Sequence, residues 1–222
     1  MRRESSTVVV LVGDVTPGLL ADLAKSPNVS IASAPAEQPA RPGAAESEVS
    51  PGWERGALAM AEAARRRSTY VIVPDDPLAE VAAQWRAMWD LSTGPGGAGF
   101  ELSAADALAA WHAKRFELPD YYLVIAKSPA EAPTPRQPLG PSQPSDDVVP
   151  DFYLGPLRSV RPRRVAVAGI GIAVAGLAAR PGQAAALLNT LRALEHGPWW
   201  PPLDDLIEVA RYFYAAALTT TT

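Results

Sequence analysis

Acidic side chains follow two short apolar runs, at the positions where strands of a parallel sheet would end. Asp14 follows residues 7–12, and Asp75 and Asp76 follow residues 70–73. The carboxyl ends of parallel strands form the ligand crevice of an open α/β sheet, so these carboxylates would converge if the two strands are neighbours. Carboxylate oxygens are ligands for Mg²⁺. The pattern therefore allows a magnesium or phosphoryl site at this edge.

Lys127 adds a cation just beyond a later apolar run, where it could neutralise a phosphoryl oxygen. Acids after the first and third strands with a lysine after a later strand form a layout that resembles, in part, that of response-regulator receiver domains. The chain lacks the first acidic pair of that family, and Pro74 precedes the acids of the third strand. The alternative interpretation is structural, because Asp75-Asp76 before Pro77 is also the pattern of a helix cap.

Tryptophans and arginines near the C-terminus form a second candidate site, suited to partner binding. Trp199 and Trp200 are adjacent in the proline-rich turn 196–202, where they cannot easily both face the core, so at least one is expected to anchor a partner. Guanidinium groups bind carboxylates and phosphates through forked donors. The predicted partner-binding residues are Trp199, Trp200, Arg158, Arg161, Arg163 and Arg164. The alternative is a turn with packed aromatic rings beside solvated arginines.

Composition argues against several classes of function. The chain has no cysteine and two histidines, which removes disulfides, thiolate chemistry and multi-histidine metal sites. A net charge of -4 argues against broad nucleic-acid binding. The longest uncharged apolar run, residues 165–179, is shorter than the roughly 20 residues that span a bilayer, and no secretory signal is evident. We expect a cytoplasmic protein without membrane contact. Its abundant arginine, alanine and proline indicate a bacterial coding bias.

Two glycine patterns share the spacing of nucleotide-binding motifs without the residues that the chemistry requires. Residues 13–18 have the glycine spacing of a phosphate-binding loop, but Leu19 and Leu20 stand where a lysine and a serine or threonine are needed. Residues 169–171 begin a dinucleotide fingerprint, but Val174 replaces its third glycine. We predict ordinary strand-to-helix turns or bends at both places.

Short apolar runs alternate with helical patterns along the chain. The first run is continuous and β-branched, which is typical of a central strand covered on both faces. The alternation predicts an α/β fold: a doubly wound, mainly parallel sheet of about five strands with helices on both faces. The predicted strands are residues 7–12, 29–33, 70–73, 121–126 and 165–168. The predicted helices are residues 17–25, 53–67, 77–89 and 103–116, followed by two closing helices, the last from Leu203.

Residues 128–150 contain seven prolines and few core-forming side chains, which predicts an exposed insertion or linker. We expect a single α/β domain over residues 1–222. Its main βα units would occupy residues 7–127, and the final strand and two closing helices would occupy residues 151–222.

The favoured function is binding or assembly, by docking of a protein partner or by self-association, with no cofactor. The alternative is a magnesium-dependent phosphoryl-transfer or phosphate-ester enzyme. That enzyme would use Asp14, Asp75, Asp76 and Lys127 as its catalytic and metal-binding residues. Whether the protein is an enzyme stays open at this level.

Overall fold

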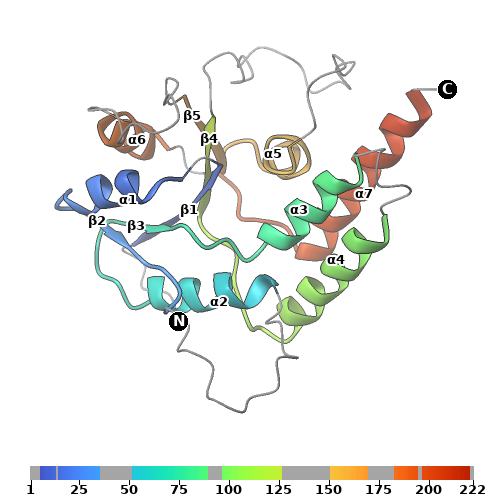
Figure 1. Cartoon of the computed structure of the whole chain (residues 1–222), viewed down its shortest axis with the longest axis horizontal. Coiled ribbons are helices and arrows are strands. Elements are labelled where there is room, and N and C mark those ends of the chain that lie inside the picture. Colours follow the sequence, from blue (N-terminus) through green and yellow to red (C-terminus); the bar gives the residue numbers. More distant parts are fainter. Residues whose placement is uncertain are drawn as a thin grey trace.

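The chain forms a doubly wound α/β fold around a five-stranded, all-parallel sheet (Figure 1). The computed structural model describes residues 6–13, 15–35, 52–89, 97–126, 151–169, 183–194 and 197–220. The strands are β1 (Thr7–Gly13), β2 (Val29–Ile31), β3 (Tyr70–Val73), β4 (Tyr121–Ala126) and β5 (Val165–Gly169). Their order across the sheet is β2-β3-β1-β4-β5.

Strand β1 lies at the centre of the sheet, as its continuous β-branched sequence predicts. Val9 is in register with Ile72 of β3 on one side and with Tyr121 of β4 on the other. The strand order differs from the 2-1-3-4-5 order that receiver-type, flavodoxin-like sheets have. The partial resemblance to receiver domains therefore does not extend to the strand order.

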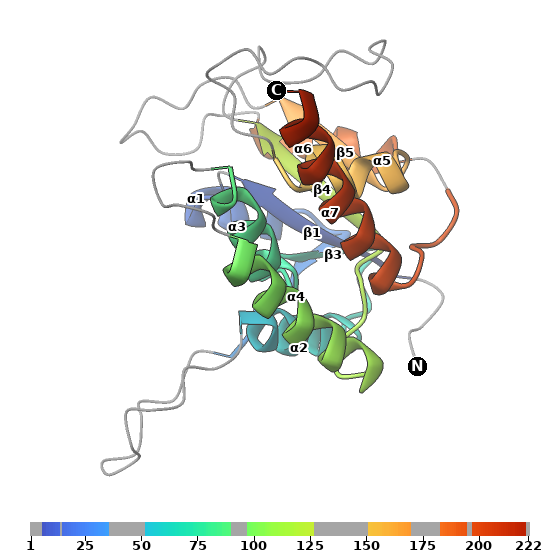
Figure 2. The same cartoon turned by 90° about the vertical axis from the view of Figure 1, so that its right-hand side faces the viewer.

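Helices cover both faces of the sheet (Figures 1 and 2). Helices α1 and α6 pack on one face, and the other helical segments pack on the opposite face. The helical segments are α1 (Pro17–Ala24), α2 (Gly52–Ala63), α3 (Ala79–Ala87), α4 (Gly97–His112), the short π-helix η3 (Tyr153–Leu157), α5 (Arg158–Val160), α6 (Gln183–Arg192) and α7 (Leu203–Thr220). Among the described residues, no helix combines the length and apolarity that crossing a membrane requires.

Alternating side chains of β1 enter two different cores. Val8 and Val10 join the larger core under α2, α3, α4 and α7, whereas Val9 and Leu11 join the smaller core under α1 and α6. Successive side chains of a strand point to opposite faces, so a strand buried on both sides must be apolar throughout. In the larger core, Trp85 is fully buried and its indole N–H donates to the Ala210 carbonyl oxygen of α7 at 3.0 Å.

Most predicted elements are confirmed, but the predicted start of α4 is wrong, and α2 and α4 end before their predicted ends, at Ala63 and His112. Thr16 caps α1, since its hydroxyl accepts a hydrogen bond from the Leu19 N–H at 3.2 Å. Ser103, the first residue of the predicted helix, lies inside α4, which begins at Gly97, and its hydroxyl donates to the Phe100 carbonyl oxygen. The predicted insertion, residues 128–150, lies outside the described residues.

Candidate functional site

The sheet places the ends of β1, β3 and β4 next to one another, as a site at the carboxyl edge requires. Asp14 and Lys127, two of the four residues predicted there, lie outside the described residues. Asp75 is described. Its Oδ1 accepts a hydrogen bond from Nε of Arg55 at 2.6 Å, and its Oδ2 accepts one from the Ala34 N–H at 3.0 Å. This carboxylate therefore connects the end of β3 to α2 and to the segment after β2.

Asp76 is buried and accepts three hydrogen bonds. Its Oδ1 accepts from the Leu78 N–H and the Tyr122 hydroxyl, each at 3.0 Å, and its Oδ2 accepts from the Tyr153 hydroxyl at 2.5 Å. The bond from the Leu78 N–H closes the turn before α3, whose N-cap residue is Leu78, so Asp76 is not the helix cap that the sequence predicted. The two tyrosines come from β4 and η3, so Asp76 fastens three separate parts of the chain together.

Burial dominates the electrostatics of this cluster. Loss of solvation raises the pKa of Asp76 above its ordinary value, although the bonds from Tyr153, Leu78 and Tyr122 lower it in part. Burial and the neighbouring Asp76 charge also raise the pKa values of Tyr122 and Tyr153 well above the usual range. Both hydroxyls therefore stay protonated and keep donating to the carboxylate.

The described carboxylates at this edge are already engaged by protein hydrogen-bond donors. Mg²⁺ requires octahedral oxygen ligands and usually keeps several waters. The oxygens of Asp75 and Asp76 already accept hydrogen bonds from protein groups, and Asp76 is buried. Within the described ranges, no group of three or more His, Cys, Asp or Glu side chains is placed to hold a metal ion. The geometry favours the structural interpretation of these two residues.

At the second candidate site, Arg164 is buried and supports the turn that carries the tryptophans. Its guanidinium donates to the backbone carbonyl oxygens of Gly197, Pro198 and Asp120 at 2.7 to 2.8 Å. The same guanidinium lies 4.4 Å from the ring centroid of Trp199. Arg164 therefore binds backbone carbonyl oxygens of the turn, and its guanidinium makes a cation–π contact with the ring of Trp199.

The other predicted arginines lie close by in sequence, and two of them contact the turn. Nε of Arg161 donates to the Trp199 carbonyl oxygen at 2.7 Å. Arg163 packs so closely against Gly197 that a Cβ atom added to this glycine would lie 3.0 Å from the Cβ of the arginine. Arg158 begins α5 and is half-buried.

The two tryptophans have different environments. Trp200 is half-buried, packs edge-on against Tyr122, and donates its indole N–H to the Pro119 carbonyl oxygen at 2.8 Å. Trp199 is 66% exposed. The turn therefore directs one tryptophan toward the core and leaves the other on the surface.

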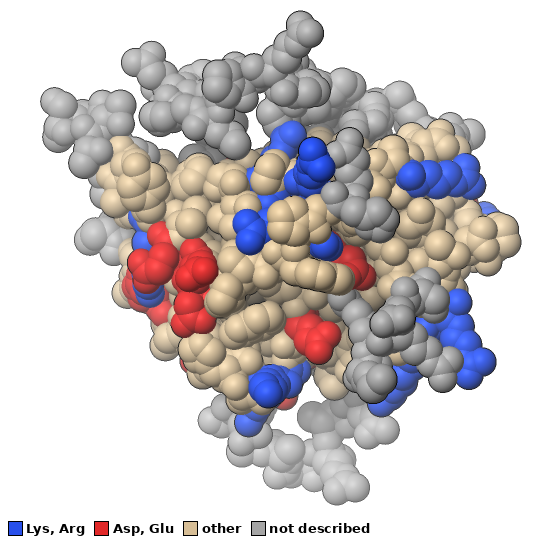
Figure 3. Space-filling model, turned by 180° about the vertical axis from the view of Figure 1, so that it is seen from behind, with Lys and Arg blue, Asp and Glu red and all other residues tan. Residues whose placement is uncertain are grey.

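We call the surface formed by Arg158, Arg161, Arg163, Arg164 and residues 197–202 the Trp199 face. Figure 2 places α5 and the orange-red segment before α7 on its right, which is the side that Figure 3 shows from the front. On that side, basic side chains surround the upper centre, while acidic side chains gather at the left and lie below (Figure 3).

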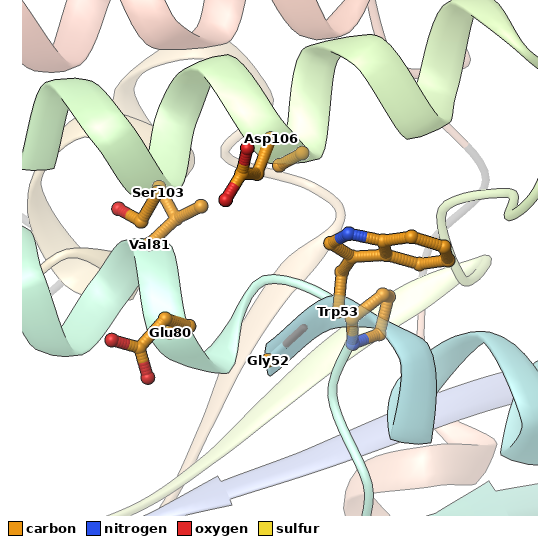
Figure 4. Close-up of a pocket in the computed structure, with 8 residues that line it drawn as sticks. Gly52, Trp53, Glu80, Val81, Ser103 and Asp106 are labelled. Atoms are coloured by element: carbon orange, nitrogen blue, oxygen red, sulfur yellow. The ribbon is translucent and has the colours of Figure 1, made fainter. Parts of the chain in front are cut away.

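A small pocket between α2, α3 and α4 has a volume of about 20 Å³ (Figure 4). Trp53 lies on one side of it, with Ser103 and Asp106 of α4 and Glu80 of α3 around the rest (Figure 4). This volume is close to that of a single water, so the pocket is too small for a substrate.

Sequence reasoning missed Tyr122, Tyr153 and the buried Asp120, whose Oδ2 accepts a hydrogen bond from the Val8 N–H at 2.7 Å. The partners of these residues are far away in sequence, and Tyr153 lies 77 positions from Asp76. Spacing along the chain carries no signal for such pairs. Comparison of the chain with protein-family models, with curated proteins and with solved structures found no match.

Proposed function

We propose that this chain is a binding protein that docks a partner protein through the Trp199 face. The observation that carries the proposal is the state of Trp199, which is 66% exposed and yet held in place. Its carbonyl oxygen is bound by Arg161, and its ring lies over the guanidinium of Arg164.

A fixed, exposed tryptophan suits protein recognition on energetic grounds. Burying the exposed two thirds of this side chain would contribute roughly 3 kcal/mol to association. Binding normally loses part of such a gain when side chains become ordered, but the bonds from Arg161 and Arg164 order this turn in advance. Tryptophan and arginine are also the residue types most enriched among energetically dominant interface residues.

The enzymatic alternative has less support from the described geometry. Asp75 is engaged by Arg55 and by the Ala34 N–H, and Asp76 is buried in a satisfied cluster. Magnesium-dependent chemistry would therefore depend on Asp14 and Lys127, and it stays a prediction that experiment can test.

The test compares Trp199→Ala with Tyr212→Ala. Tyr212 is an exposed aromatic residue of α7, 71% exposed, and serves as the matched control. A partner retained by the full-length protein is identified, purified and titrated by calorimetry against each variant. We expect Trp199→Ala to weaken binding about 30-fold, because an interface residue of this kind contributes about 2 kcal/mol. Tyr212→Ala should bind like the unmodified protein.

Two outcomes would contradict the proposal. Equal affinities of the unmodified protein and Trp199→Ala would show that the exposed tryptophan is not the anchor. A loss caused equally by Tyr212→Ala would show a general effect of removing surface aromatic groups. Sedimentation of the protein alone identifies the case in which the partner is a second copy.

A further inference from the structure

We infer that the segment of the partner that docks on the Trp199 face is acidic. This inference rests on the proposed function and specifies the chemistry of the partner. It comes from how the charges of this surface are compensated, which is a separate observation from the exposure of Trp199.

The local charge is strongly positive on a protein that is acidic as a whole. Residues 152–169 and 197–202 contain four arginines and no aspartate or glutamate, whereas the whole chain has a formal net charge of -4. The concentration of cations at this place is therefore not a consequence of overall composition.

Three arginines of this surface, Arg158, Arg161 and Arg164, differ from arginines elsewhere in the fold. Arg55, Arg66 and Arg211 each form an ion pair with a carboxylate. In the described parts of the chain, the guanidinium groups of Arg158, Arg161 and Arg164 form no ion pair with a carboxylate. The acceptors of Arg161 and Arg164 are backbone carbonyl oxygens, which satisfy the hydrogen bonds without cancelling the charge.

Because Arg164 is buried, water screens the positive charge of its guanidinium only weakly. The Arg164 side chain is only 5% exposed. Buried charges in proteins are normally paired. Here the guanidinium lies directly beneath the exposed ring of Trp199. A group that covers this ring would therefore meet a positive potential, which favours carboxylates and opposes basic segments.

The surroundings favour a short acidic segment over a long polyanion. Asp204 and Asp205 stand in the first turn of α7, directly after the turn 197–202. Figure 3 shows acidic side chains to the left of the basic group and below it on the same side of the molecule. A nucleic-acid strand that extended beyond the arginines would run into like charges, whereas a short peptide would not.

The experiment measures binding of a fluorescent acidic peptide, rich in glutamate with one leucine, to the full-length protein by anisotropy. The matched peptide has glutamine in place of each glutamate. An RNA oligonucleotide and anionic lipid vesicles test other polyanions. The protein variants are Trp199→Ala and the double variant Arg158→Gln/Arg163→Gln, which leaves the arginines that hold Trp199 intact. The double variant Arg65→Gln/Arg67→Gln, just after α2, removes the same charge elsewhere.

We expect the acidic peptide to bind and the glutamine peptide to bind at least about tenfold more weakly. Trp199→Ala and Arg158→Gln/Arg163→Gln should each weaken binding of the acidic peptide about tenfold. The Arg65→Gln/Arg67→Gln control should bind normally. Bound acidic peptide should also protect the Trp199 emission from quenching by iodide, an effect absent in Trp199→Ala.

Equal binding of the acidic and glutamine peptides, or no binding of the acidic peptide, would overturn the inference. Tighter arginine-dependent binding of RNA or vesicles would also overturn it. These failures are distinct from failure of the proposed function. If Trp199→Ala weakens the protein partner while the peptides show no charge preference, docking stands and the acidic partner is wrong. If Trp199→Ala leaves the protein partner unaffected, docking itself fails.

Discussion

Asp76, which the sequence offered as a possible magnesium ligand, accepts hydrogen bonds from three protein groups in the structure. Its three donors come from the start of the α3 region, from β4 and from η3. A buried carboxylate without such donors would be strongly destabilising. With them, it joins the turn before α3, β4 and η3 by hydrogen bonds. The cost of its burial is visible in its raised pKa.

This raised pKa predicts a specific dependence of stability on pH. The folded protein holds the proton of Asp76 more tightly than the unfolded chain, whose value is 3.8. The contribution of Asp76 is therefore greatest below pH 3.8 and is lost as the pH rises through its folded pKa. Asp76→Asn is neutral throughout, so its stability relative to the unmodified protein should increase as the pH rises over that range.

Urea unfolding at a series of pH values measures this difference. Asp106→Asn, which changes an exposed carboxylate of α4, is the matched control and should follow the unmodified protein. Parallel pH profiles for Asp76→Asn and the unmodified protein would show that Asp76 does not titrate differently in the folded state.

For single residues, the sequence predicted where they lie relative to strands and turns better than it predicted which residues they contact. It identified Asp75 and Asp76 as residues after a strand, but the carboxylate of Asp76 binds the turn before α3 and does not cap the helix, whose N-cap residue is Leu78. It also predicted that one of the paired tryptophans would be exposed. It could not predict that the carbonyl oxygens of the turn bind Arg161 and Arg164, because these residues are 33 to 38 positions apart in the sequence.

Among the elements, the end of β1 requires a glycine for structural reasons. This glycine, Gly13, is the first residue of the segment whose spacing resembles a phosphate-binding loop. Gly13 ends β1 with a φ of 98°, and a Cβ atom there would lie 2.5 Å from the Ile125 carbonyl oxygen of β4. We expect Gly13→Ala to lower the free energy of unfolding by at least about 2 kcal/mol, from backbone strain and the clash. Urea unfolding measures this change.

Gly97→Ala is the control for Gly13→Ala. A Cβ atom at Gly97 meets nothing within 4 Å, so this substitution at the start of α4 should be neutral or slightly stabilising. Similar losses in both variants would contradict the close approach of β1 and β4 as the cause.

The strands were predictable from sequence, while the start of α4 was not. Strands β1, β3 and β4 are apolar runs bounded by turn residues, a strong local signal. The helix predicted from residue 103 begins six residues earlier, at Gly97. Glycine has a low helix propensity, so Gly97 and Gly99 give no local signal of a helix start.

At the scale of the whole molecule, the two candidate functions predict different responses to magnesium. Under the binding proposal, we expect millimolar Mg²⁺, alone or with nucleotides and phosphate esters, to leave the melting temperature unchanged. The reason is that Asp75 and Asp76 already bind protein donors. Thermal unfolding of the protein and of an Asp14→Asn/Asp75→Asn variant measures this. A metal-dependent rise that the variant loses would establish the magnesium site instead.

From the described contacts we expect the polypeptide to tolerate an interruption between Ala126 and Asp151. Asp120 and Tyr122 precede residues 127–150, whereas Tyr153 and Arg164 follow them. These two sides are joined by the β4–β5 pairing, by the bond from Arg164 to the Asp120 carbonyl oxygen, and through Asp76 by the two tyrosines. None of these connections passes through residues 127–150. We expect a chain opened there, or lengthened by an inserted sequence, to keep its two fragments associated and to keep Trp199 in position.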